Sequence, residues 1–304
     1  MSKDWTLNHL GMMVTNRNAV LNHFQSFGMG VSVGPQPLLP YQDGKGELMY
    51  YQNIDGDPIT HKYVTGGAHN FRDGNLQIGD CQLEVYPMKP GPGMFISEYL
   101  EQKGPGINHI AFNTLNIERD TKFLMGKGCD LVFNASVNGN TIENYLDTRK
   151  FGDLMISLRP PADDWERKWK LNNASHPLVK DWRILGVGIV VEDIGLATEF
   201  YLNLGFSLEG TEKKYETLNV KSNRLKVGPL VFEFLEPTSK DSIFYDCFLN
   251  RGQGVTDMMF LVEDVNLEVE KLVERGANLL VSTDKYALFD TRKEGNTLTR
   301  LLKG

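Results

Sequence analysis

The chain repeats itself, and this repetition limits the folds open to it more than any other feature. Residues 14–28 align without gaps on residues 191–205, an offset of 205 − 28 = 177 positions. Later, Asp147-Thr-Arg-Lys150 recurs as Asp290-Thr-Arg-Lys293, each time with a glycine two residues after the lysine. A repeat this long is typical of a tandem duplication of one structural module. We therefore expect two domains, residues 1–160 and 182–304, joined by a polar, proline-bounded linker at 161–181.

Each half divides again into two similar units. A strand, a helix of about ten residues ending at glycine, and three short strands follow one another in each unit. The four units span residues 8–87, 107–159, 184–237 and 255–303. This pattern predicts an α+β fold of four βαβββ units. Paired units should form two domains, each with a curved, mixed or antiparallel sheet that encloses a cleft.

Composition excludes several classes of partner. The 304 residues carry a net charge of −7 with both signs interspersed, so no basic stripe is available for nucleic acid. No segment approaches the roughly 18 consecutive apolar residues of a membrane span. The three cysteines are far apart and the N-terminus does not resemble a signal peptide, which predicts a cytoplasmic protein.

Two histidines and a glutamate are the candidate metal ligands. His9 and His109 each open an apolar, strand-like run, and Glu84 lies near the end of another. Two imidazoles and one carboxylate on neighbouring strands can hold a divalent metal and leave coordination positions open for a substrate. Gln82 would share a strand face with Glu84 and is the alternative to it. A histidine on an apolar strand is more often a structural residue, and Glu84 at a strand edge could simply be solvated.

The order of segments resembles the vicinal oxygen chelate superfamily, which includes glyoxalase I, methylmalonyl-CoA epimerase, extradiol dioxygenases, and the fosfomycin and bleomycin resistance proteins. The similarity to methylmalonyl-CoA epimerase is concentrated in residues 95–104, 106–112 and 152–158. The resemblance implies ligands on the first and last strands of paired units, at His9, Glu84, His109 and Ser157. Because Ser157 replaces the family's glutamate, we expect three protein ligands and one divalent ion: Mn, Co, Ni, Zn or Fe(II).

The second half retains little of this pattern. The counterparts of His9, His109 and Ser157 are Gly186 (9 + 177), Asp257 (109 + 148) and Arg300 (157 + 143), while Glu233 corresponds to Glu84. No histidine follows His176. We therefore expect one metal site per chain, with the second domain structural or shaping the substrate pocket.

Further candidates surround the predicted ligands. Glu47 is the candidate catalytic base, on a strand that loosely matches one from which epimerases of this family project a carboxylate; an exposed glutamate is the alternative. His61 and His69 lie in a glycine-rich insert that could cover the site, and are candidate substrate contacts. Tyr145, with Asn144 before it, and Ser157 are further candidates for lining the substrate pocket.

The predicted partner is a small molecule with two neighbouring oxygens. Bound to such a substrate, the metal would stabilise the enolate formed on proton removal, which predicts an epimerase, isomerase or lyase. An Fe(II) dioxygenase is the alternative, because two histidines and a carboxylate are also the ligand set of that class. In the dioxygenases that this chain resembles, however, the metal site lies in the second domain. A binding protein of the resistance type is the third alternative. The sequence neither requires nor excludes a homodimer. The four units supply within one chain the pairing that shorter relatives obtain by dimerising.

Overall fold

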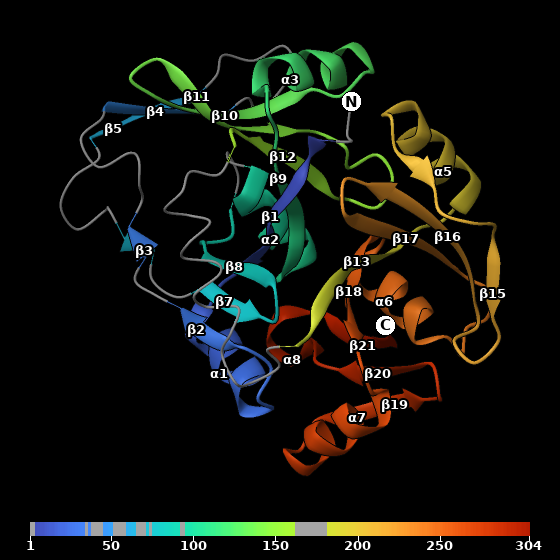
Figure 1. Ribbon diagram of the computed structural model, residues 1–304. Coiled ribbons are helices and arrows are strands. Elements are labelled where there is room, and N and C mark those ends of the chain that lie inside the picture. Colours follow the sequence, from blue (N-terminus) through green and yellow to red (C-terminus); the bar gives the residue numbers. More distant parts are fainter. Residues whose placement is uncertain are drawn as a thin grey trace.

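The computed structural model describes residues 4–33, 36–37, 45–50, 59–64, 71–72, 75–91, 95–161 and 181–304. These residues form two open, curved sheets, one in each half of the chain, with helices packed on them (Figure 1). The predicted α+β fold of paired βαβββ units is confirmed.

The first sheet is built around two antiparallel strands, one from each unit. Its strands are β1 (Thr6–Val14), β2 (Val31–Val33), β4 (Lys45–Tyr50), β5 (Ile59–Val64), β7 (Asn75–Ile78), β8 (Cys81–Pro87), β9 (Gly106–Asn113), β10 (Leu131–Val137), β11 (Asn140–Leu146) and β12 (Met155–Arg159). They lie in the order β2-β7-β8-β1-β9-β12-β11-β10-β4-β5. The first unit therefore supplies β1, β2, β7 and β8, and the second supplies β9 to β12.

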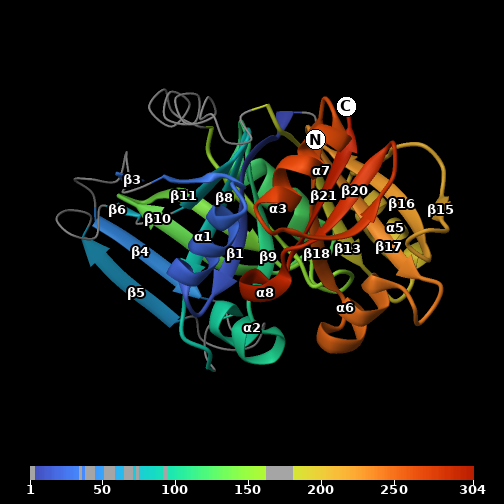
Figure 2. The ribbon, with the colours of Figure 1, turned by 90° about the horizontal axis from the view of Figure 1, so that it is seen from below.

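The hairpin β4–β5 is an insertion that crosses from one unit to the other. It lies between β2 and β7 in the sequence, yet β4 pairs antiparallel with β10, so that Leu48 is opposite Ala135. Figure 2 shows the hairpin at the end of the molecule remote from the second half. Two further short strands, β3 (Gln36–Pro37) and β6 (Phe71–Arg72), pair with each other.

The second sheet repeats the first without this inserted hairpin among its described strands. It contains β13 (Arg183–Val190), β14 (Ser207–Leu208), β15 (Lys213–Tyr215), β16 (Val220–Val227), β17 (Leu230–Pro237), β18 (Gly254–Val262), β19 (Asn278–Ser282), β20 (Tyr286–Asp290) and β21 (Leu298–Lys303). The order is β14-β16-β17-β13-β18-β21-β20-β19, with β15 beside β16. Here β13 and β18 are the central pair, as β1 and β9 are in the first sheet.

The helix of each unit begins and ends in the same way, which explains the sequence repeat. The unit helices are α1 (Arg17–Ser26), α3 (Ile117–Gly126), α5 (Ile194–Asn203) and α7 (Val265–Glu274). Each is capped by an Asn or Asp whose side chain accepts a backbone N–H of the first turn. Each is followed by a glycine with φ between +75° and +92°, a conformation that side chains disfavour: Gly28, Gly128, Gly205 and Gly276.

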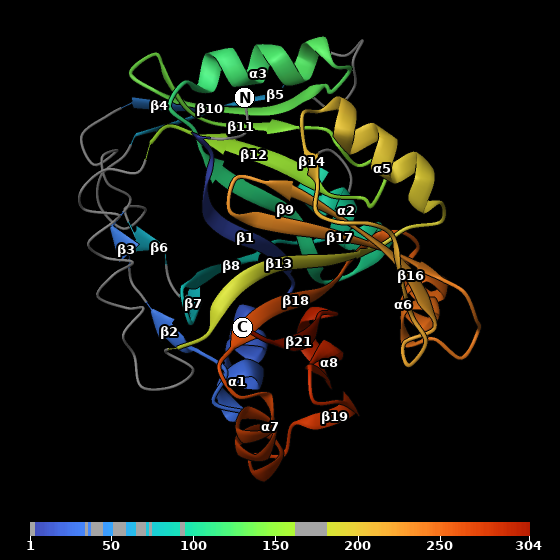
Figure 3. The ribbon, with the colours of Figure 1, turned by 45° about the vertical axis from the view of Figure 1, so that its right-hand side comes forward.

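The connecting helices α2 (Phe95–Lys103) and α6 (Ile243–Arg251) lie between the paired units. A short helix, α8 (Arg292–Gly295), lies beside α1. Figure 3 shows α3 and α5 near one another on one side of the molecule and α1 near α7 on another. No helix in the described part of the chain is long and apolar enough to cross a membrane.

The two halves pack with reciprocal contacts. Within the first half the Trp5 indole donates to Asp120 Oδ2 at 2.8 Å, and within the second half its counterpart Trp182 donates to Glu268 Oε2 at 3.0 Å. The tight turn at Gly79 approaches the Trp182 carbonyl so closely that a Cβ would lie 2.0 Å from it. Gly228 meets the Trp5 carbonyl in the same way. One continuous apolar core, with residues from both halves, joins the two sheets.

Candidate metal centre

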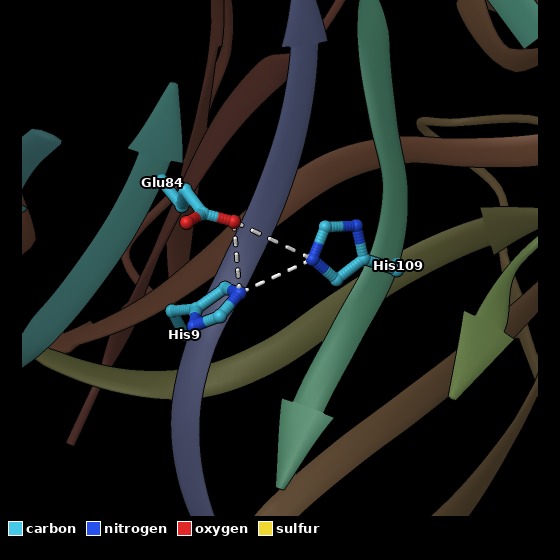
Figure 4. A group of neighbouring side chains, drawn as sticks. All are labelled: His9, Glu84 and His109. Carbon is cyan, nitrogen blue, oxygen red and sulfur yellow. Dashed lines mark hydrogen bonds and ion pairs between the residues drawn. The ribbon is translucent and has the colours of Figure 1, made fainter. Parts of the chain in front are cut away.

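His9, Glu84 and His109 converge from three adjacent strands (Figure 4). His9 Nε2 lies 3.1 Å from His109 Nε2 and 3.2 Å from Glu84 Oε2. His109 Nε2 lies 3.7 Å from the same carboxylate oxygen. All three side chains are at most 6% exposed. The three sequence-predicted ligands therefore meet at one buried point.

Strand register brings these residues together. On β1, Gly11 pairs with Glu84 of β8 on one side and with His109 of β9 on the other. A Cβ on Gly11 would lie 1.8 Å from the His109 ring, so the imidazole can lie over β1 only because this residue has no side chain. Gly11 thus opens the space through which His109 reaches His9 and Glu84.

Replacing Gly11 by alanine should displace the His109 imidazole and weaken metal binding by about 10–100-fold, the range typical of changes that misorient a ligand. The check is a titration with Mn²⁺ or Zn²⁺ by calorimetry. Gly126→Ala is the matched control, since its added methyl group would meet nothing within 4 Å. Unchanged affinity in Gly11→Ala would contradict this role.

Each histidine is held by the asparagine that precedes it. His9 Nδ1 lies 2.7 Å from Asn8 Oδ1, and His109 Nδ1 lies 2.8 Å from Asn108 Oδ1. The oxygen of Asn8 is identified by Arg159, which can only donate and does so to it at 3.2 Å. The Nδ1 of His9 therefore carries the proton, and its Nε2 presents a lone pair toward Glu84. The contact between Asn108 and His109 is the equivalent arrangement on β9. The recurring Asn-His dipeptide was a signal in the sequence for these supporting residues, which the sequence analysis did not use.

This set of atoms fits a divalent metal. Imidazole and carboxylate are common ligands of Zn, Mn and Fe(II), and an ion between these three atoms would offset the repulsion between their lone pairs. Ligands about 2.1 Å from an ion are separated by about 3.0 Å at right angles and about 3.4 Å at the tetrahedral angle. The measured separations of 3.1, 3.2 and 3.7 Å lie close to that range.

Asn108→Ala should lower metal affinity by about 10–100-fold because the His109 tautomer and ring orientation lose their support. Asn108→Asp retains an oxygen acceptor for Nδ1 and should bind metal at least as tightly as the native chain. Metal titration of both variants is the measurement. Equal weakening in both would mean that Asn108 acts by packing alone.

A carboxylate not predicted from the sequence lies beside the position of the missing ligand. Ser157 on β12 is fully buried and donates to Glu143 Oε1 on β11 at 2.7 Å. Glu143 is itself 8% exposed. No local sequence pattern indicates Glu143, because its importance depends on the register between β11 and β12.

Tyr145 lies against the predicted metal ligands. Its hydroxyl is 3.1 Å from His109 Nε2, and its ring packs on Phe95 and Phe133. Tyr145 is paired with Ser157 across β11 and β12, so the two share a sheet face with Glu143. Asn144 points to the other face, where its amide donates to Thr121 of α3. Asn144 therefore packs against α3 and does not line the site.

Three sequence candidates stay predictions. Glu47 is on β4, opposite Ser136, and the structure describes its strand position but not its side chain. Counted along the sheet, β4 is four strands from β9, or about 19 Å at the usual strand spacing. His61 is on β5 opposite Leu48, again without a described side chain. His69 lies outside the described residues.

In the second half, Arg300 occupies the position equivalent to the candidate metal site. Register confirms the predicted counterparts, because Gly188 pairs with Glu233 and with Asp257 as Gly11 does with Glu84 and His109. The buried Arg300 guanidinium lies 2.7 Å from Glu233 Oε2 and 2.7 Å from Asp257 Oδ2. A guanidinium thus occupies the space between these carboxylates, as expected for a half without a metal.

The two carboxylates that bind Arg300 differ in their electrostatics. Burial raises the pKa of Glu233, but Arg300 and Arg224 outweigh it and hold that pKa at about 2. Burial also raises the pKa of Asp257, and there the cation Arg300 compensates only in part. Glu233 is therefore the firmly ionised member of the cluster.

Comparison with known proteins finds similarity among solved structures, and this similarity concerns the fold. No protein-family model matches the chain, and no curated protein sequence matches it. Among solved structures, a mutant of 4-hydroxymandelate synthase from Streptomyces coelicolor is similar with a TM-score of 0.66. The identity is 14%, over 99% of this chain and 93% of that chain.

Shorter matches cover 40% of this chain. Methylmalonyl-CoA epimerase from Mycobacterium tuberculosis is 22% identical over 86% of its own length, with a TM-score of 0.36. A variant of the Streptomyces coelicolor epimerase is 24% identical over 96% of its length, also with a TM-score of 0.36. The full-length match to the synthase, together with the four paired units, confirms the predicted resemblance at the level of the fold: the chain has the fold of the vicinal oxygen chelate superfamily.

Proposed function

We propose that this chain is a divalent-metal-dependent enzyme that acts on a small molecule through two neighbouring oxygens. His9, Glu84 and His109 would hold one ion, and the reaction would be epimerisation, isomerisation or elimination through an enolate. The observation that carries the proposal is the buried convergence of two imidazole Nε2 atoms and one carboxylate oxygen within 3.1–3.7 Å.

The residues around this point suit such a substrate. A metal bound there would supply a Lewis acid that stabilises negative charge on the substrate oxygens. Tyr145 presents its hydroxyl 3.1 Å from His109 Nε2, where it can donate to an oxygen of the bound molecule. Phe95 and Phe133 pack around Tyr145 and form an apolar wall that would exclude water beside it.

An Fe(II) dioxygenase is the second candidate, supported by the same ligands. Two histidines and one carboxylate with open positions are the ligand set of many iron oxygenases. The fold of 4-hydroxymandelate synthase matches the chain over nearly its full length, although 14% identity extends only to the fold. The two candidates differ in whether O₂ is consumed.

The test is metal content per chain by mass spectrometry on protein purified without added metal or chelator, followed by two assays. Metal-dependent exchange of the methyl protons of pyruvate in D₂O, observed by NMR, would support enolate chemistry. Iron in the purified protein, with O₂ uptake on addition of an oxygen-chelating aromatic acid, would favour the dioxygenase. If no divalent ion binds after incubation with each candidate metal, both candidates fail.

A further inference from the structure

Glu143 is a buried carboxylate that the ligand cluster does not use. It lies on β11 two residues before Tyr145, and the Ser157 hydroxyl holds its Oε1 at 2.7 Å. Within the described part of the chain, Ser157 is its one hydrogen-bond partner and no cation pairs with it. Burying a carboxylate that makes a single hydrogen bond costs stability, and groups retained at such a cost are typical of functional sites.

The register places this carboxylate beside the metal ligands on the same sheet face. Ala111 of β9 pairs with His9 on one side and with Ser157 on the other. Two small side chains, Ala111 and Ser157, therefore lie between His9 and β11 on this face. Glu143 and Tyr145 follow on β11, one strand beyond Ser157.

Other charged groups near Glu143 do not neutralise it. Arg159 follows Leu158, which pairs with Asn144, so its backbone lies across from Glu143. Its guanidinium, however, donates to Asn8. Glu84 is committed to the two histidines. Glu143 is thus the carboxylate on this face that is neither within the ligand cluster nor paired with a described cation.

We infer that Glu143 is the group that removes and returns the substrate proton, with Ser157 as its positioning residue. In the first step the bond between hydrogen and the carbon beside the substrate carbonyl breaks. The proton passes to a Glu143 oxygen, and the electron pair moves to the carbonyl oxygen to give the enolate. In the reverse step Glu143 returns the proton to that carbon. This inference rests on the proposed function, and it assigns the base to Glu143 instead of Glu47.

The experiment compares the native chain with Glu143→Gln, both loaded with Mn²⁺, using two probes. Pyruvate reports proton removal through exchange of its methyl protons in D₂O. Oxalate, a planar dianion that resembles the enolate, reports binding without reaction. Glu118→Gln, which neutralises an exposed carboxylate on α3, is the matched control.

We expect equal Mn²⁺ content in all three proteins. In Glu143→Gln, proton exchange should fall at least about 100-fold, the usual contribution of a general base. Oxalate should bind at least about 10-fold more tightly to this variant, because a carboxylate facing the dianion has been removed. Ser157→Ala should slow exchange less than Glu143→Gln and shift its pH profile, since the base is retained but no longer held.

The outcomes separate the inference from the proposed function. Exchange and oxalate affinity in Glu143→Gln equal to those of the native chain would overturn the inference while leaving the metal site intact. If the native chain binds oxalate but does not exchange pyruvate protons, the oxalate affinities of Glu143→Gln and Glu118→Gln still decide whether Glu143 faces the ligand. A native chain that binds neither Mn²⁺ nor oxalate would overturn both.

Discussion

Replacing His109 by alanine is expected to weaken divalent-metal binding by more than about 100-fold, beyond the roughly 10–100-fold effect typical of residues that only support a ligand. The imidazole supplies one of three converging protein atoms, and its loss leaves His9 and Glu84 alone. The measurement is metal content after dialysis, with affinity from titration. Activity on any metal-dependent substrate should fall in parallel.

His23→Ala is the control for this prediction. His23 lies on α1, outside the ligand cluster, and should leave the metal content unchanged. Because His109 is fully buried, unfolding must be excluded by circular dichroism. A folded His109→Ala protein that retains one tightly bound ion per chain would show that the metal is held elsewhere.

Arg300→Met is expected to destabilise the folded chain by about 3–5 kcal/mol, because it leaves Glu233 and Asp257 buried without their shared cation. This loss should lower the melting temperature by roughly 5–10 °C for a chain of this size. The native Glu233, with its pKa held at about 2, contributes stability that is present above pH 4.5 and disappears as the pH falls toward 2.

The pH dependence distinguishes this mechanism from a simple loss of packing. Without Arg300, the folded-state pKa of Asp257 should rise further above its unfolded value, while that of Glu233 rises less because Arg224 remains beside it. Folding is therefore disfavoured increasingly as the pH rises. The destabilisation should therefore be larger at pH 8 than at pH 5. Adding Asp257→Asn to Arg300→Met should recover part of the loss at pH 8. A pH-independent effect would mean that the charge of Arg300 contributes little.

The sequence predicted the fold and the three candidate ligands because both depend on local patterns that are repeated. The four helix caps and terminal glycines recur at fixed offsets, and these offsets also identified Gly186, Asp257 and Arg300 as counterparts. The family resemblance favoured Glu84 over Gln82 as the ligand, and the structure brings Glu84 to the two histidines.

The residues that sequence reasoning missed depend on contacts between strands. The importance of Glu143 follows from the pairing of β11 with β12, which brings the Ser157 hydroxyl to its carboxylate. Asn144 was grouped with Tyr145, but neighbouring residues of a strand point to opposite faces, and only Tyr145 points to the site. Likewise, no local pattern indicated that β4 would pair with β10.

The crossing hairpin β4–β5 also determines when parts of the chain can fold. Tyr50 pairs with Phe133, which is 133 − 50 = 83 residues later, and Gly46 pairs with Val137, 137 − 46 = 91 residues later. At roughly 5–20 residues per second, a ribosome needs about 4–18 s to synthesise that interval. During this time β4 has been made but its partner β10 has not. The first half of the protein therefore cannot complete its sheet until most of its second unit has been synthesised.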